Sequence, residues 1–255
     1  ITERLPFIDF SLGTSNINKI TEAIEKATSK TPFFDFSENG CTGSVFIAPS
    51  KQKSSLKAFV TIMKGCNNFC SYCVVPYVRG KEASRESKDI LNEVSGLAEQ
   101  GIKEVTLIGQ NVNSYNKGKN DLSFPELLEA IDGIHDIKRI RFVTSHPKDL
   151  SEELVGCFGR LEKLCEQIHL PFQSGSDKIL KLMNRGYVIK DYIDKINRLR
   201  ERVPDITITS DCIVGFPGED EKAFYETMLL IQEIQFDCVF SFSYSPRKYT
   251  AAQTL

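Results

Sequence analysis

The 255-residue sequence lacks a long apolar run, a recognisable leader and a large net charge, and each absence excludes a class of protein. Its longest apolar runs, such as Phe59–Met63 and Val105–Gly109, are far shorter than the ~20 residues of a membrane-spanning helix. Residues 1–6 show neither the basic start nor the apolar stretch of a secretory signal peptide. With 41% hydrophobic and 26% charged residues, we expect a globular, intracellular and cytoplasmic protein without a membrane partner.

The formal net charge of −2 gives no overall electrostatic signature of nucleic-acid binding. Contact with RNA would therefore need a local basic patch or a segment outside this sequence. Residues 177–202 carry eight Lys and Arg against four acidic residues, a local excess that could follow an RNA backbone. The same pattern is typical of a solvated helix face, and both interpretations stay open.

The eight cysteines are too few to hold a chain of this length together by disulfides, and three of them fall within eight residues. In a reducing compartment such crowding favours metal binding over disulfides. Cys157, Cys165, Cys212 and Cys238 lie in predicted helices or strands, where cysteine behaves as a small apolar residue. We expect Cys212 and Cys238 to be buried. Cys41 falls in a predicted linker.

The chain beyond residue 55 alternates between short apolar segments and amphipathic ones. Before it, a strand-like segment at 5–12 and a helix at 18–27 lead into a predicted linker at 37–55. Strands are predicted at 56–63, 103–109, 139–144, 166–170, 206–214 and 237–243, and helices at 87–100, 124–134, 151–158, 192–203 and 221–234. Six βα repeats predict an α/β fold with a parallel sheet, either doubly wound or a partial barrel, two strands short of a closed eight-stranded one.

Polar residues gather directly after the predicted strands. They form the segments 109–111, 144–147, 170–173 and 215–219. In either architecture the carboxyl edge of the parallel strands is where the functional site belongs.

Cys66, Cys70 and Cys73 form a CxxxCxxC motif directly after the first strand of the βα series. Thiolates are preferred ligands of zinc, copper(I) and iron–sulfur clusters. A structural zinc needs a fourth protein ligand, and no second CxxC or HxxxH pair follows at a zinc-like spacing. Three ligands imply an open position, which on a four-iron cluster would bind a substrate or cofactor. A zinc knuckle and three incidental loop thiols remain alternatives.

The motif, with Tyr72 before its last cysteine, resembles the cluster motif of the radical S-adenosylmethionine (SAM) enzymes. The wider sequence resembles the methylthiotransferases, in particular the branch that modifies tRNA, over residues 56–255. The matching segments are 65–80, 84–86, 107–115, 141–147, 169–177, 182–187 and 210–219. The resemblance implies a partial (β/α)6 radical SAM barrel at 49–255, preceded at 1–48 by the tail of an N-terminal α/β methylthiotransferase domain and a linker. Because the family's TRAM domain and most of its N-terminal domain are missing, we expect a fragment.

The resemblance assigns a four-iron four-sulfur (4Fe-4S) cluster to Cys66, Cys70 and Cys73, with SAM on its open iron. An auxiliary 4Fe-4S cluster is implied only in the longer parent protein. The residues implied in cofactor binding are Tyr72, Gly109, Gln110, Asn111, Ser145, Gln173, Arg185, Gly215, Pro217 and Gly218. Arg185 could meet either the SAM carboxylate or an RNA phosphate. No side chain is singled out as catalytic.

The implied reaction is methylthiolation at C2 of N6-isopentenyladenosine beside the anticodon, with the anticodon stem-loop of tRNA as partner. It consumes two SAM molecules, one for the radical and one for the methyl group, and takes electrons from a donor such as flavodoxin or ferredoxin. The alternatives are a methylthiotransferase for threonylcarbamoyl-adenosine in tRNA or for a ribosomal protein, and a non-catalytic metal-binding RNA module. Segments 144–147 and 173–177 favour the isopentenyl-adenosine branch.

Overall fold

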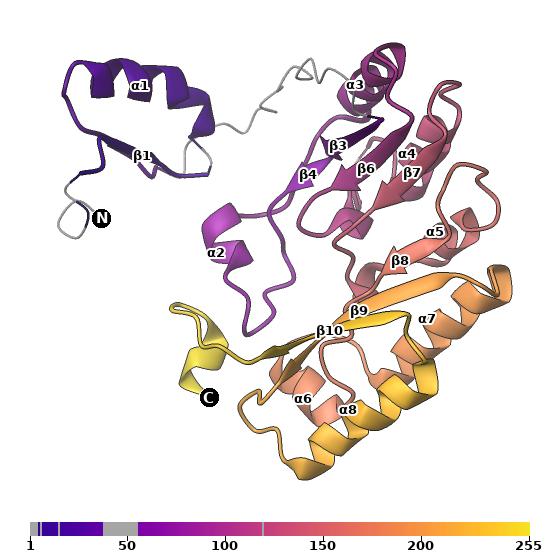
Figure 1. The fold of residues 1–255 in the computed structure, drawn as a ribbon. Coiled ribbons are helices and arrows are strands. Elements are labelled where there is room, and N and C mark those ends of the chain that lie inside the picture. Colours follow the sequence, from indigo (N-terminus) through magenta and orange to yellow (C-terminus); the bar gives the residue numbers. More distant parts are fainter. Residues whose placement is uncertain (1–4, 6, 15, 38–55, 119) are drawn as a thin grey trace. The chain divides into compact units, whose positions relative to one another are not determined.

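The computed structural model describes residues 5, 7–14, 16–37, 56–118 and 120–255. The chain divides into two compact units, residues 1–48 and 49–255 (Figure 1). Of the predicted linker only residue 37 is described, and Cys41 lies outside the described residues. No helix in the described part of the chain is long and apolar enough to cross a membrane.

The smaller unit contains one βαβ arrangement. Strands β1 (Phe10–Leu12) and β2 (Phe33–Asp35) pair in parallel. Between them lie a 3-10 turn (Ile17–Lys19) and helix α1 (Ile20–Thr28), which confirms the predicted helix. The buried Asn16 side chain ties the unit together, since its Nδ2 donates to Asp35 Oδ1 at 2.8 Å.

The larger unit is built on six parallel strands. Two three-stranded sheets have the orders β3-β6-β7 and β8-β9-β10, and a parallel bridge between Ile140 and Leu164 links them. This arrangement is the predicted partial barrel. The strands are β3 (Lys57–Thr61), β6 (Glu104–Ile108), β7 (Arg139–Phe142), β8 (Gln167–His169), β9 (Thr207–Val214) and β10 (Cys238–Ser243).

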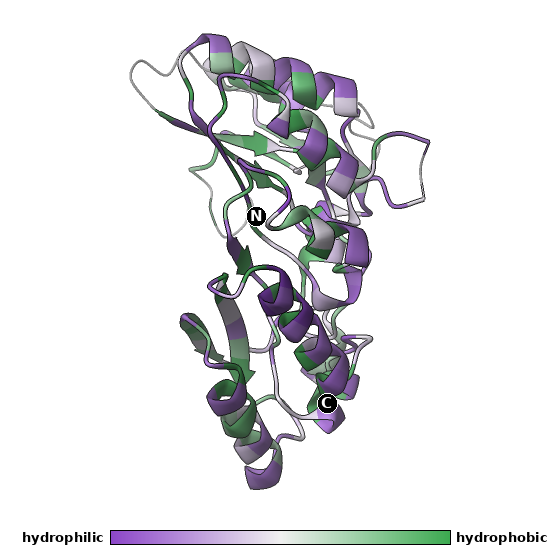
Figure 2. Ribbon diagram, turned by 90° about the vertical axis from the view of Figure 1, so that its right-hand side faces the viewer, coloured by the Kyte–Doolittle hydropathy of each residue, from purple (hydrophilic) through white to green (hydrophobic). Residues whose placement is uncertain are grey.

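Helices cover the sheet with their apolar sides and turn polar sides outward (Figure 2). The predicted helices are present as α3 (Ser87–Glu99), α4 (Phe124–Asp132), α5 (Glu152–Cys157), α7 (Ile189–Arg202) and α8 (Glu221–Ile234). Two more, α2 (Val75–Arg79) and α6 (Asp177–Leu182), are not among the predicted helices. Short 3-10 turns occur at Val112–Ser114, Pro147–Asp149 and Ala251–Thr254.

The core of the larger unit lies between the strands and these helices. Val105, Leu107, Ile140, Ile168 and Ile208 are all fully buried in it. Burial of this apolar set keeps the strands in register, and their carboxyl ends therefore share one edge.

The cysteines of the helices and strands differ in their burial. Cys212 is buried, as expected; Cys157 is buried as well, whereas Cys165 is half-buried. The prediction that Cys238 is buried is wrong, because it is exposed. It lies on β10, which ends its sheet, and five of the six residues of that strand are exposed.

Candidate functional site

The cysteine motif occupies a loop that a small antiparallel pair holds at its base. Strands β4 (Met63–Lys64) and β5 (Ala83–Ser84) form this pair. At the loop's entrance Gly65 has φ +76, and its backbone N–H donates to Gln110 Oε1 at 2.7 Å. The predicted cofactor residue Gln110 therefore anchors the loop.

A buried carboxylate ties the same loop to the strand ends. Asp149 accepts from Asn111 Nδ2 at 2.8 Å, from Lys117 Nζ at 2.9 Å and from Asn68 Nδ2 at 3.3 Å. Asn68 is a loop residue between the first two cysteines, and Asn111 follows β6. Asn111 thus helps to orient the loop, and its contact with SAM stays a prediction.

The three thiols differ in exposure but stand in one neighbourhood. Cys70 is buried, while Cys66 and Cys73 are half-buried. Burial, followed by the weaker effects of the Glu82 charge and the other two cysteines, raises the pKa of Cys66 to about 11. A bound metal centre displaces that proton, because thiolates are the ligands. Within the described residues no three His, Cys, Asp or Glu side chains are grouped closely enough for one metal ion. Three cysteine thiols on one loop are the type of donor that iron–sulfur clusters use.

The Cys70 sulfur has two nitrogen neighbours from distant parts of the chain. Arg185 Nη1 lies 3.4 Å from it and His146 Nε2 lies 3.9 Å from it. Burial, followed by the charge of Arg185, lowers the pKa of His146 to about 2, so this imidazole is neutral. Its Nδ1 accepts from the Lys148 backbone at 3.1 Å, which leaves the proton on Nε2, facing Cys70.

Arg185 is buried, with an exposed fraction of 4%. Its guanidinium donates to the Pro171 carbonyl at 2.8 Å and to the Tyr72 and Tyr187 hydroxyls at 3.3 Å each. An RNA phosphate has no access to a side chain buried in this way, so that reading of Arg185 is wrong. Its contact with the SAM carboxylate stays a prediction.

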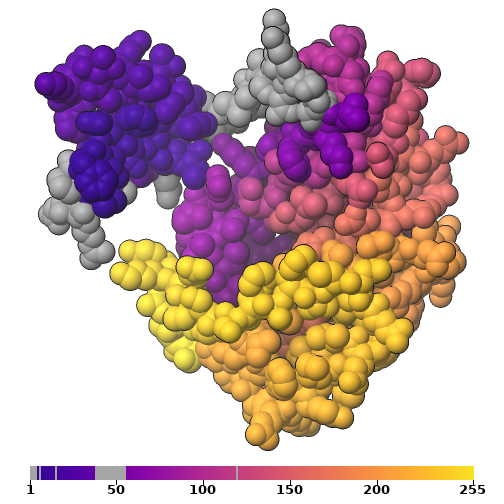
Figure 3. Space-filling model, in the orientation of Figure 1, coloured from indigo at the N-terminus to yellow at the C-terminus, as the bar shows by residue number. Residues whose placement is uncertain are grey.

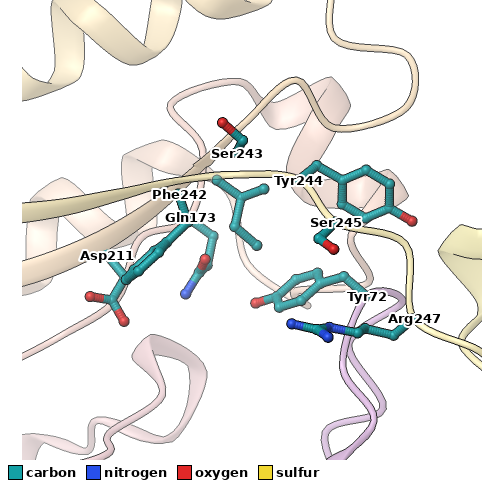
Figure 4. Close-up of a pocket in the computed structure, with 9 residues that line it drawn as sticks. Tyr72, Gln173, Asp211, Phe242, Ser243, Tyr244, Ser245 and Arg247 are labelled. Carbon is teal, nitrogen blue, oxygen red and sulfur yellow. The ribbon is translucent and has the colours of Figure 1, made fainter.

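A cavity of about 280 Å³ opens beside the loop and includes two of the predicted cofactor residues, Tyr72 and Gln173. The Gln173 amide, the Asp211 carboxylate and the Tyr72 ring lie on the same side of β10 (Figure 4). Gln173 has φ +69 although it is not glycine, and such strain concentrates at functional sites. The remaining lining residues are Asp211, Ile213, Phe242, Ser243, Tyr244, Ser245 and Arg247.

Sequence reasoning missed Asp211, Tyr244 and Arg247. The expectation that polar residues just after a strand belong to the site could have found Tyr244 and Arg247, since both lie in the segment that follows β10. Asp211 lies within β9 and gives no such signal. The segment after β10 also reaches the cysteine loop, because the Ala252 backbone donates to the Ser71 carbonyl at 2.8 Å. In Figure 3 this yellow end of the chain covers part of the visible face.

The other predicted cofactor residues do not line this cavity. Gly109 packs closely on Met63, where an added Cβ would lie 2.5 Å from Met63 Cγ. Gly215, Pro217 and Gly218 form the turn after β9, and their SAM contacts stay predictions. Three buried polar atoms near the loop lack a hydrogen-bond partner among the described residues: Ser71 Oγ, Asn111 Oδ1 and Ser145 Oγ. Such atoms leave capacity for a polar ligand.

The basic side chains of 177–202 are largely engaged by the protein itself. The pairs Lys178–Asp220 and Lys190–Asp194 are both 2.8 Å long, and Arg198 pairs with Glu152. Lys195 Nζ donates to the Pro147 carbonyl and Arg200 to the Ile234 carbonyl. These contacts favour the solvated-face interpretation over a free cationic stripe.

Fold and site together define an α/β barrel protein with a loop of three cysteines at the carboxyl edge of its strands. The chain belongs to the radical SAM superfamily, whose family model matches residues 60–231. It is 53% identical, over its full length, to the tRNA-2-methylthio-N(6)-dimethylallyladenosine synthase of Thermodesulfovibrio yellowstonii, covering 58% of that protein. It is 52% identical, over 98% of its length, to the synthase of the same name from Syntrophus aciditrophicus, covering 54% of it. The chain thus spans little more than half the length of these relatives.

Solved structures share the fold at low sequence identity. The radical SAM methyltransferase TsrM from Kitasatospora setae, with cobalamin and a [4Fe-4S] cluster bound, superposes with a TM-score of 0.63 and 18% identity. That match covers 76% of this chain and 38% of TsrM. Coproporphyrinogen III oxidase from Escherichia coli superposes with a TM-score of 0.56 and 17% identity, covering 78% of this chain and 46% of the oxidase.

Proposed function

We propose that this chain is the radical SAM part of a tRNA methylthiotransferase. The full reaction replaces the C2 hydrogen of N6-isopentenyladenosine, beside the anticodon, with a methylthio group. One observation carries the proposal: a three-thiol loop at the carboxyl edge of a parallel barrel, in a chain 53% identical over its whole length to a protein named for this product.

Cys66, Cys70 and Cys73 would hold a four-iron cluster together with SAM. When bound, the cluster and SAM together would supply a 5′-deoxyadenosyl radical that can take hydrogen from an unactivated carbon. The chain's own residues place and shield the reacting groups. Tyr72 and Gln173 line the cavity beside the loop, while Gln110 and Asp149 keep the loop in place.

The longer protein supplies what this chain does not carry. We assign residues 1–48 to the tail of an N-terminal methylthiotransferase domain and linker, and 49–255 to the radical SAM core. The N-terminal domain of the parent would hold the auxiliary 4Fe-4S cluster. The partners are the anticodon stem-loop of tRNA and an electron donor such as flavodoxin or ferredoxin, in the cytoplasm. By itself this chain should cleave SAM without transferring sulfur.

Anaerobic reconstitution with iron and sulfide tests the cluster site. Wild type should gain four irons per chain, a broad visible absorbance that dithionite bleaches, and production of 5′-deoxyadenosine from SAM. The Cys70→Ala variant should lose all three, whereas Cys238→Ala, which removes an exposed thiol on β10, should keep them. A folded wild type with three reduced thiols that binds no iron would overturn the proposal.

The substrate is tested separately. Transfer RNA from a strain without the parent gene should lack the methylthio group on isopentenyl-adenosine, as measured by mass spectrometry of its nucleosides. Loss of a methylthio group from threonylcarbamoyl-adenosine or from a ribosomal protein instead would assign the chain to another branch.

A further inference from the structure

The buried guanidinium of Arg185 forms no ion pair with a carboxylate in the described part of the chain. Its hydrogen-bond partners are the Pro171 carbonyl, two tyrosine hydroxyls and the Cys70 sulfur. A buried charge without an opposite charge is strongly unfavourable, and proteins keep one only where something compensates it. Of these partners, only the Cys70 sulfur would carry negative charge, as a thiolate ligand of a bound metal centre.

Cys70 is also the ligand with the most donors around it. The Arg185 guanidinium and the protonated Nε2 of His146 both face its sulfur, at 3.4 and 3.9 Å. The neighbouring Cys66 sulfur has one backbone donor, the Asn68 N–H at 3.5 Å. Hydrogen bonds and positive charge at the ligand sulfurs stabilise the more negative, reduced form of an iron–sulfur cluster and raise its reduction potential.

We propose that Arg185 is the counter-charge of the cluster at Cys66, Cys70 and Cys73, acting through the Cys70 sulfur, rather than a cation needed for the fold. It is thus a positioning residue that sets the cluster's potential, while the Pro171 carbonyl and the tyrosine hydroxyls fix the direction of its guanidinium. His146 adds a neutral donor to the same sulfur. This inference rests on the proposed cluster site.

The test compares wild type with Arg185→Met, Arg185→Lys and the control Arg198→Met. Arg198 belongs to the same basic segment but forms an exposed ion pair with Glu152. Each 255-residue chain is measured without metal for its unfolding temperature, and after reconstitution for its cluster midpoint potential. The potential is followed by electron paramagnetic resonance during a dithionite titration.

In Arg185→Met the potential should fall by about 59 mV or more, which is a tenfold change in a one-electron equilibrium. Arg185→Lys should recover more than half of that loss, and Arg198→Met should match wild type. The metal-free Arg185→Met chain should unfold no earlier than metal-free wild type, because an apolar side chain then replaces an uncompensated charge.

Three results would overturn the inference. The first is a reconstituted Arg185→Met chain with the wild-type potential. The second is a Lys variant with a potential as low as that of Met, which would assign the effect to donor geometry instead of charge. The third is a metal-free Arg185→Met chain that is unfolded, which would make Arg185 a structural residue. A wild type that takes up no iron would instead refute the cluster site itself.

Discussion

Replacing Gly65 with alanine should disrupt the base of the cysteine loop. Gly65 has φ +76, where an alanine is disfavoured by about 1–2 kcal/mol. The new Cβ would also lie 2.1 Å from the Lys81 carbonyl oxygen and 2.6 Å from that of Gly80. Both neighbours are backbone atoms, which cannot rotate away as a side chain can. Overpacking of this kind adds about 1–3 kcal/mol, so the expected loss of stability is about 2–5 kcal/mol.

Gly101 offers a matched control. It follows α3, where the Gly101 N–H bonds to the Ala98 carbonyl and the Ile102 N–H to the Leu97 carbonyl, the pattern of a Schellman cap. Its φ is +93, and nothing lies within 4 Å of an added Cβ. Gly101→Ala therefore carries the backbone strain without the collision and should lower stability by about 1–2 kcal/mol.

The free energy of unfolding of both variants is measured by urea titration, with far-ultraviolet circular dichroism reporting the transition of the larger unit. Gly65→Ala should lose more free energy of unfolding than Gly101→Ala, and it should also incorporate less iron. Equal losses in the two variants would refute the close approach between the Gly65 backbone and the Lys81 carbonyl.

Two further variants test how the loop is held. Gln110→Ala leaves the buried Gly65 N–H without its acceptor, which should lower the free energy of unfolding by about 1–3 kcal/mol. Hydrogen exchange at the Gly65 amide should become faster, and an unchanged exchange rate would contradict the prediction. For Asp149, burial raises the pKa, but hydrogen bonds from Asn111 and Lys117 outweigh it and hold the pKa below its usual value. A lowered pKa contributes stability that is present above about pH 4 and is lost as the pH falls through the folded-state value. Asp149→Asn should thus be less stable at pH 7 and lose less on acidification, and acid unfolding curves that run parallel to wild type would count against this.

The alternation of strands and helices could be predicted from sequence where an element shows a clear hydrophobic period. The eight residues of β9 and the fourteen of α8 carry clear patterns. The short helix α6 does not, and its boundaries depend on tertiary contacts. The burial of Cys238 was mispredicted for a related reason: an apolar run predicts a strand but not whether that strand ends its sheet.

The candidate site shows the same limit. The spacing of Cys66, Cys70 and Cys73 is local, and it predicts their joint role. The surroundings of their sulfurs are not local, and in the sequence Arg185 looks like one more member of a basic run. Asp211 lines the cavity because of its place in the pleat of β9 and because β10 pairs with β9 beside it. Both depend on the folded chain and not on the local sequence.

The contacts around the cysteine loop also bear on when the site is made during protein synthesis. Arg185 lies 115 residues after Cys70 in the chain, and Ala252, which bonds to Ser71, is synthesised later still. At a ribosome's ~5–20 residues per second, those 115 residues take roughly 6–23 s. Throughout that interval the nascent chain presents three thiols before the residues that will enclose them exist. If the proposed cluster forms here, oxidation and capture of other thiol-binding metals compete with its assembly during this interval, because the residues that enclose the thiols are made last.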